Sequence, residues 1–241
     1  MTGRLAVWSG PRNVSTALMR SWENRPDSIV IDEPLYAYYL ARTGLDHPGR
    51  DEVLAAGETD WRTVVKRLRA PAPSGVQIVY EKHMAHHLLP EVERSWLRDA
   101  TNVLLIRDPR EVVASYVRSR SDVTVDDVGL RQQVSLYDDL DAAGMTPSVI
   151  DAADFLREPE RYLRALCELV AVPFVDSMLR WPPGPRDSDG VWAPYWYASV
   201  WKSTGFTPPA QRDIELTGAA AVVAEECRPF YQQLHGHRWR P

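Results

Sequence analysis

The sequence predicts an α/β fold, in which a mostly parallel sheet carries helices on both faces and an aromatic-rich cap lies toward the C-terminus. Short apolar runs alternate along the chain with segments of helical pattern, which favours buried strands joined by helices. The 241 residues are 44% hydrophobic and 25% charged, which is ordinary for a soluble globular protein with a substantial core. There is no internal repeat and no low-complexity tail, so we expect a single domain over residues 1–241.

Five apolar runs predict the strands of this sheet, and they lie at residues 5–8, 28–31, 77–80, 103–106 and 148–150. Helices are expected at residues 17–22, 61–69, 90–98, 111–116, 126–143, 159–170 and 208–234. Two stretches rich in Gly, Pro and charge, residues 42–60 and 181–194, are expected to be loops or lids.

The first strand leads into a turn that suits an anion. Gly10 lets the chain turn closely, Pro11 restricts the backbone, and Arg12 supplies a cation ahead of the next helix. Ser15 and Thr16 can cap that helix or donate hydroxyl hydrogens to a ligand. Since helix N-termini attract phosphate and sulfate, this turn is a candidate anion site; the alternative is an ordinary strand-to-helix turn.

The same turn differs from the phosphate-binding loop of nucleotide hydrolases, G-x-x-x-x-G-K-[ST]. Counting from Gly10, Ser15 stands where the second glycine is required and Thr16 where the lysine is required. The loop therefore gives little support to magnesium–ATP chemistry.

A second junction of the same kind follows the fourth strand. Arg107 stands where that strand ends, at the edge where ligands of open α/β sheets collect. Asp108 and Pro109 have the pattern of a helix N-cap and first helical residue, and Ser115 lies inside the helix they open. Alternatively, Arg107 and Asp108 form a structural ion pair and Ser115 is merely small.

Together the two junctions resemble the PAPS-dependent sulfotransferase family. Residues 11–16 are similar to its Pro-[Lys/Arg]-Ser-Gly-Thr-Thr loop, and Arg107 with Ser115 matches its arginine followed eight positions later by serine. The resemblance implies a P-loop NTPase-like three-layer sandwich, PAPS as co-substrate, no metal, and transfer of a sulfuryl group to a hydroxyl or amine. The sequence departs from the pattern at Asn13 and at Val14, which replaces a glycine.

The resemblance also implies roles for the residues at both ends of the donor. The 5′ end of PAPS would be bound by Arg12, Asn13, Ser15 and Thr16, and the 3′-phosphate by Arg107 and Ser115. The two groups of residues would then bind the two anionic ends of one nucleotide.

A proton acceptor for the reacting hydroxyl or amine is expected near the donor. Glu33, which follows the second strand in an Ile-Asp-Glu-Pro-Leu segment, is similar to a glutamate of carbohydrate-type sulfotransferases and is our first candidate base. His83 is the second candidate, and Lys82 is a candidate for stabilising the leaving oxygen. Glu33 could instead cap a helix, and Asp32 with Glu33 could instead bind metal as in P-loop ATPases. The histidines at 83, 86 and 87 lack the spacing of a tetrahedral metal site, so no metal is expected.

Aromatic residues are dense near the C-terminus, at Trp181, Trp192, Tyr195, Trp196, Tyr197, Trp201 and Phe206. Aromatic side chains bury large areas and can stack on a base, so residues 201–206 could close over the adenosine. Lys202 in that segment is a candidate for neutralising the 3′-phosphate. The alternative is plain packing under a loop-rich cap.

Charge and cysteine content suggest the remaining expectations. A net charge of −5 argues against a nucleic-acid partner, and no apolar run has transmembrane length. Cys167 and Cys227 lack metal spacing, so reduced thiols and a cytoplasmic location are expected. Three hypotheses follow: a PAPS-dependent sulfotransferase with a small-molecule acceptor, a P-loop kinase or nucleotide hydrolase, and a non-catalytic nucleotide-binding module.

Overall fold

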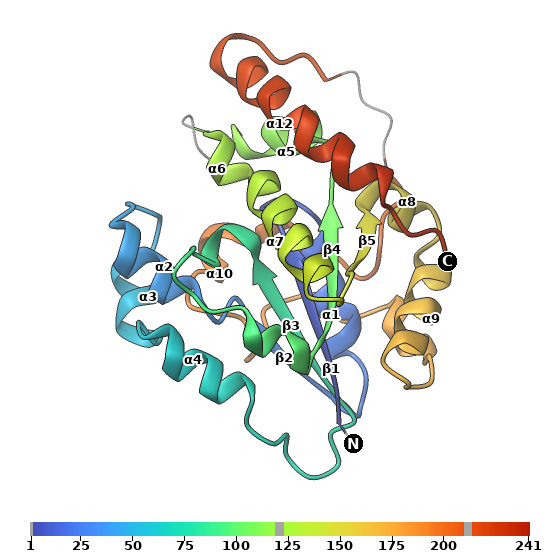
Figure 1. Cartoon of the computed structure of the whole chain (residues 1–241). Coiled ribbons are helices and arrows are strands. Elements are labelled where there is room, and N and C mark those ends of the chain that lie inside the picture. Colours follow the sequence, from blue (N-terminus) through green and yellow to red (C-terminus); the bar gives the residue numbers. More distant parts are fainter. Residues whose placement is uncertain (1, 119–122, 210–213) are drawn as a thin grey trace.

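The computed structural model describes residues 2–118, 123–209 and 214–241 (Figure 1). Its centre is a parallel sheet of five strands in the order β2-β3-β1-β4-β5. The strands are β1 Gly3–Ser9, β2 Ser28–Asp32, β3 Ile78–Met84, β4 Thr101–Ile106 and β5 Ser148–Asp151. All five predicted strands are present, and the α/β fold predicted from the sequence is confirmed.

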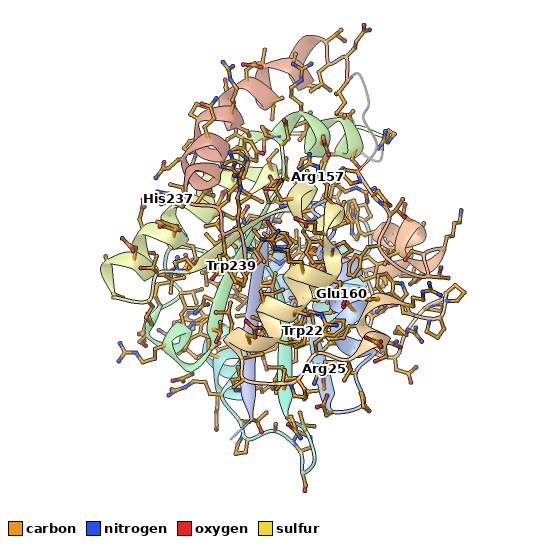
Figure 2. All side chains as sticks on the ribbon, turned by 90° about the vertical axis from the view of Figure 1, so that its right-hand side faces the viewer. Trp22, Arg25, Arg157, Glu160, His237 and Trp239 are labelled. Atoms are coloured by element: carbon orange, nitrogen blue, oxygen red, sulfur yellow. The ribbon has the colours of Figure 1, made fainter. Side chains whose placement is uncertain are left out.

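Helices cover both faces of this sheet and make three layers. The α-helices are α1 Ser15–Glu23, α2 Tyr36–Thr43, α3 Arg50–Ala56, α4 Trp61–Leu68, α5 Pro109–Tyr116, α6 Val125–Val128, α7 Leu130–Ala142, α8 Ala152–Arg157, α9 Pro159–Leu169, α10 Ala193–Trp196, α11 Ala198–Trp201 and α12 Gly218–Gly236. On one face, α1, α8 and α9 pack on the sheet; α8 and α9 carry the labelled Arg157 and Glu160 at the front of Figure 2. On the other face, α4, α5, α7 and α12 pack on alternate residues of the same strands. Within the described residues, no helix is both long and apolar enough to cross a bilayer.

One predicted loop and one predicted helix are wrong. The stretch at residues 42–60 contains the end of α2 and all of α3. The first turn of α3 carries Asp51 and Glu52, whose negative charges interact favourably with the helix dipole and stabilise the helix. The helix predicted at residues 90–98 is present only as the short 3-10 helix Ser95–Asp99.

Two further predicted helices have different limits. The one predicted at residues 126–143 is interrupted at Gly129, whose φ of 76° ends α6 and begins α7. The one predicted at residues 208–234 begins only at Gly218, and its residues 210–213 lie outside the described part of the chain. Both errors have one cause: apolar periodicity marks a buried face but does not show where the backbone changes direction.

The parallel arrangement brings the carboxyl ends of the strands to one edge of the sheet. Asp32 at the end of β2 is in register with Lys82 of β3, and Ser9 at the end of β1 is in register with both Met84 and Leu105. Residues that follow β1, β2 and β4 therefore meet at this edge, as do the last residues of β3, although they are far apart in the sequence.

Candidate active site

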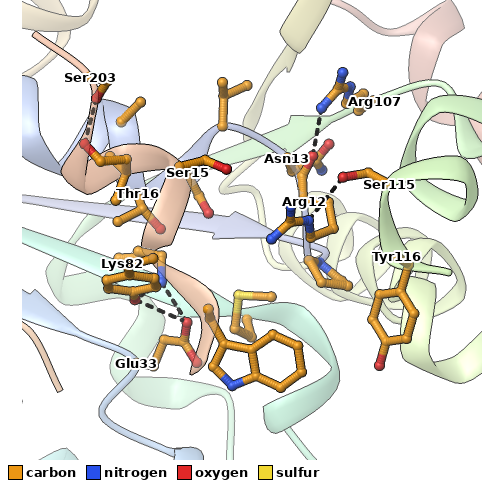
Figure 3. Close-up of a pocket in the computed structure, with 18 of the residues that line it drawn as sticks. Arg12, Asn13, Ser15, Thr16, Glu33, Lys82, Arg107, Ser115, Tyr116 and Ser203 are labelled. Carbon is orange, nitrogen blue, oxygen red and sulfur yellow. Dashed lines mark hydrogen bonds and ion pairs between the residues drawn. The ribbon is translucent and has the colours of Figure 1, made fainter. Parts of the chain in front are cut away.

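A cavity of about 320 Å³ lies at this edge of the sheet and receives residues from four strand ends and from the C-terminal cap, defined here as residues 181–207. Eight of the ten residues predicted for the site line it: Arg12, Asn13, Ser15, Thr16, Glu33, Lys82, Arg107 and Ser115. Figure 3 shows these eight side chains around the opening. The two predicted residues that do not line it are His83 and Lys202.

The loop between β1 and α1 is held in an unusual backbone conformation. Arg12 and Val14 have φ values of 60° and 58°, in the left-handed region that L-residues rarely adopt. Gly10 approaches the end of α6 so closely that an added Cβ would lie 2.1 Å from the carbonyl oxygen of Val128. The Asn13 amide donates to the carbonyl of Leu105 at 2.7 Å and so fixes the loop to β4. Left-handed residues in such loops can turn backbone N–H groups toward an anion.

The two predicted anion sites touch each other. Arg12 Nε donates a hydrogen bond to Ser115 Oγ at 3.0 Å, and Arg107 Nη1 donates to the Arg12 carbonyl at 2.7 Å (Figure 3). Arg107 also donates from Nε to Glu111 at 2.7 Å, so it pairs with the residue four positions on and not with Asp108. Asp108 caps α5 by accepting from the Arg110 amide, as predicted. The guanidinium of Arg107 has five N–H donors, and those not used in these contacts remain available to bind a ligand.

Three arginines interact at this corner of the cavity. Burial is the main cause that lowers the pKa of Arg12, and the charges of Arg118 and Arg107 lower it further. Like charges this close repel one another, and a bound anion would relieve that repulsion. The corner is therefore suited to a phosphate or sulfate group.

A buried ionic network lies on the other side of the cavity. Lys82 Nζ donates to Asp32 Oδ1 at 2.9 Å, to Glu33 Oε1 at 2.5 Å and to the Tyr197 hydroxyl at 2.8 Å. The Tyr197 hydroxyl in turn donates to Asp32 Oδ2 at 2.7 Å. Because Tyr197 belongs to the cap, this network also fixes the cap over the end of the sheet.

Glu33 has the environment of a general base. Burial and the neighbouring Asp32 raise the pKa of its carboxyl, while Lys82 acts in the opposite direction. Oε1 accepts from Lys82, and Oε2 faces the imidazole of His87, whose Nδ1 is 4.0 Å away. The φ of Glu33 is 41°, so the backbone is strained at this candidate base as well as in the loop.

His83 lies on the other face of the sheet. Strand β3 continues to Met84, four residues beyond its predicted end, so side chains alternate through Lys82 and His83. Lys82 faces the cavity, whereas His83 stacks on Trp8 with ring centroids 4.1 Å apart and contacts Glu81 at 3.2 Å. We therefore give His83 no role in the cavity.

Lys202 is also placed elsewhere. Its side chain is exposed and lines a separate hollow together with Arg180 and Trp181. Its neighbours Ser203, Gly205 and Phe206 do line the main cavity, so the predicted segment reaches the site without its lysine. Only part of the predicted aromatic cluster lines the cavity. Trp196, Tyr197 and Phe206 line it, whereas Tyr195 does not and is 48% exposed.

Several lining residues were not predicted from the sequence. Tyr36 of α2 and His86 and His87 of the 3-10 helix Ala85–His87 line the cavity beside Glu33. The histidines could have been found because they follow β3 closely at its carboxyl end. Tyr197 carries no such signal, because its place depends on how the cap folds back.

The chain is similar to known proteins in sequence and in fold. The family model described as "Sulfotransferase domain" matches residues 3–237. Among solved structures, the sulfotransferase domain of the Synechococcus PCC 7002 olefin synthase has a TM-score of 0.60 at 17% identity, covering 96% of this chain and 95% of that one. A sulfotransferase from Alicyclobacillus acidocaldarius has a TM-score of 0.56 at 16% identity, covering 100% and 98%. At these identities the two structures show a shared fold.

Two curated relatives come from Arabidopsis thaliana. They are named branched-chain-amino-acid aminotransferase-like proteins 2 and 1, and they are 37% and 39% identical over 231 and 230 residues. The alignments cover 96% and 95% of this chain but only 41% of each relative. The chain thus corresponds to less than half of those longer proteins.

Proposed function

Because the chain belongs to the sulfotransferase domain family, we propose that it moves a sulfuryl group from PAPS to a hydroxyl or amine of a small-molecule acceptor. The family and the shared fold support the transfer of sulfate as the reaction class. The identity of the donor and the roles of single residues rest on the cavity described above.

The donor-binding part of the proposal rests on two groups of residues. Arg12, Ser15 and Thr16 at the start of α1 would bind the 5′-phosphosulfate, and Asn13 would hold their loop against β4. Arg107 and Ser115 would bind the 3′-phosphate, for which a guanidinium fork is well suited.

Glu33 would act as the base at the acceptor side. Its Oε2 would take the proton of the acceptor hydroxyl or amine as the acceptor atom bonds to sulfur. The bond from sulfur to the 5′-phosphate oxygen breaks in the same exchange, and adenosine 3′,5′-bisphosphate leaves with the electron pair. Lys82 holds the other oxygen of Glu33 and, in the present arrangement, orients the base.

The single observation that carries the proposal is the hydrogen bond between Arg12 and Ser115. It joins the two motifs at one cavity, so that a single nucleotide could span them. Motifs on opposite faces of the sheet would have had no common ligand.

Nucleotide binding tests the proposal directly. Adenosine 3′,5′-bisphosphate should raise the melting temperature without metal, and Mg–ATP should raise it less at equal concentration. Preferential stabilisation by Mg–ATP would favour a kinase or hydrolase. Tight bisphosphate binding with no turnover over a broad acceptor panel would favour a non-catalytic binding module.

A further inference from the structure

The part of the cavity next to Glu33 has its own lining, distinct from the side formed by Arg12, Arg107 and Ser115, which we call the arginine corner. We call it the acceptor compartment and define it by Tyr36, His86, His87, Trp196 and Tyr197, all of which line the cavity. In Figure 3, Arg107 and Ser115 lie on the opposite side of the view from Lys82 and Glu33. Ligand groups held by the arginines would thus leave this compartment open to a second molecule.

Within the described part of the chain, no lysine or arginine beside this compartment has a hydrogen left to donate. Among the described residues, the arginines and lysines that line the cavity are Arg12, Arg107 and Lys82. The ammonium group of Lys82 has three hydrogens, and its three partners are Asp32, Glu33 and Tyr197. A negatively charged acceptor could bind Lys82 only by displacing one of these buried partners.

The imidazoles of His86 and His87 supply no positive charge either. Burial lowers the pKa of His86 to about 3 and holds the pKa of His87 well below its usual value, so both rings are neutral at physiological pH. They are 8% and 2% exposed, and Nδ1 of each has no hydrogen-bond partner within the described residues. His87 is fixed by stacking on Tyr36, with ring centroids 4.6 Å apart. Neutral, buried and unpartnered groups of this kind suit the hydroxyl of an uncharged ligand.

The fixed charges around the compartment have a negative sum. Asp32 and Glu33 carry two carboxylates against the single ammonium of Lys82. Burying a further anion beside them, with no free cation to pair it, is costly. A neutral group avoids this cost, and for a cationic group the attraction to the two carboxylates offsets it.

From these contacts, and from the aromatic side chains of Tyr36, Trp196 and Tyr197 that line the compartment, we propose that it binds a ring-bearing hydroxyl acceptor that is uncharged or cationic. It excludes acceptors that carry a negative charge. The proposal rests on the proposed function, because it takes the arginine corner as the donor site. The exclusion of anionic acceptors follows from the saturated ammonium of Lys82 and from the absence of any other lysine or arginine among the described residues on this side of the cavity.

The test uses three phenols that share a ring and differ at the end of a short side chain: tyramine (cationic), tyrosol (neutral) and 4-hydroxyphenylacetate (anionic). Titration calorimetry would measure their binding to the protein saturated with adenosine 3′,5′-bisphosphate. We expect tyramine and tyrosol to bind at least about tenfold more tightly than the carboxylate. Glu33→Gln should reduce this difference in affinity severalfold. Glu91→Gln should leave the difference unchanged, because Glu91 is exposed and does not line the cavity.

Two results would overturn the assignment. One is a carboxylate that binds as tightly as tyrosol, and the other is failure of all three phenols to bind the bisphosphate complex. Failure of the bisphosphate itself to bind would instead remove the donor site and with it the proposed function, so the two failures can be told apart.

Discussion

Arg12 in the loop after β1 and Ser115 in α5 are joined by a hydrogen bond of 3.0 Å, although 103 positions separate them in the chain. The contact closes the arginine corner, where Arg107 in turn holds the Arg12 backbone. A cation, a hydroxyl and a helix N-terminus are thereby set around one space.

Arg107→Ala should weaken the binding of adenosine 3′,5′-bisphosphate by about 10- to 100-fold, because charge-assisted hydrogen bonds contribute roughly 1.5–3 kcal/mol. Calorimetric titration measures this loss. Arg110→Ala is the matched control, since Arg110 lies three positions further along, in the first turn of α5, is exposed and does not line the cavity. Unchanged affinity in Arg107→Ala would show that this arginine is structural.

Glu33→Gln should leave bisphosphate affinity intact and lower kcat by about 10²- to 10⁴-fold, the usual contribution of general base catalysis. The carboxyl must be ionised to accept a proton. Wild-type kcat should therefore fall as pH decreases through the raised pKa of Glu33, and this acid limb should be absent from the variant. Full activity in the variant would exclude Glu33 as the base.

Although Glu33→Gln should lower kcat, it should raise the thermal stability of the protein at neutral pH. Since burial raises the pKa of Glu33, the folded state binds its proton more tightly than the unfolded state does. The free energy of unfolding contributed by this group is then present at acid pH and is lost as pH rises through the folded-state pKa. Glu33→Gln should raise the melting temperature at neutral pH, and this gain should shrink toward acid pH. A gain that is independent of pH would contradict the argument.

Val14→Gly should stabilise the fold by roughly 1 kcal/mol, because a β-branched residue at a φ of 58° is strained and glycine is not. In a chain of this length such a change corresponds to about 2–4 °C in melting temperature. Val14→Ala keeps a Cβ and should gain less. An equal gain in melting temperature in both variants would show that the bulk of the valine side chain, and not the backbone conformation, causes the strain. Bisphosphate affinity should stay constant or rise in Val14→Gly, and a clear loss would show that the loop needs valine.

Tyr197→Phe should lower the free energy of unfolding by about 1–3 kcal/mol, since it leaves a buried Lys82 hydrogen and an Asp32 oxygen without their hydroxyl partner. Chemical denaturation measures the change. Tyr195→Phe is the matched control, because Tyr195 is 48% exposed. Equal stability of the two variants would mean that the cap is held by its other contacts.

Local chemistry in the sequence was enough to predict the strands and both junctions. Each strand is a short apolar run, and the cap formed by Asp108 and Pro109 depends only on adjacent residues. The faces of β3 were not predictable in the same way. The charged residues Glu81 and Lys82 read as the end of the strand, yet they continue it because buried partners satisfy their charges.

What the sequence by itself determined is therefore the order of the strands along the chain, the family resemblance and most of the predicted residues that line the cavity, since these depend on neighbours within a few positions. Tertiary structure alone decided that Lys82 faces the cavity and His83 does not, that Lys202 lies outside it, and that Tyr197 reaches Asp32. These outcomes depend on strand length, sheet register and the return of the cap, which arise from packing between segments that are distant in sequence.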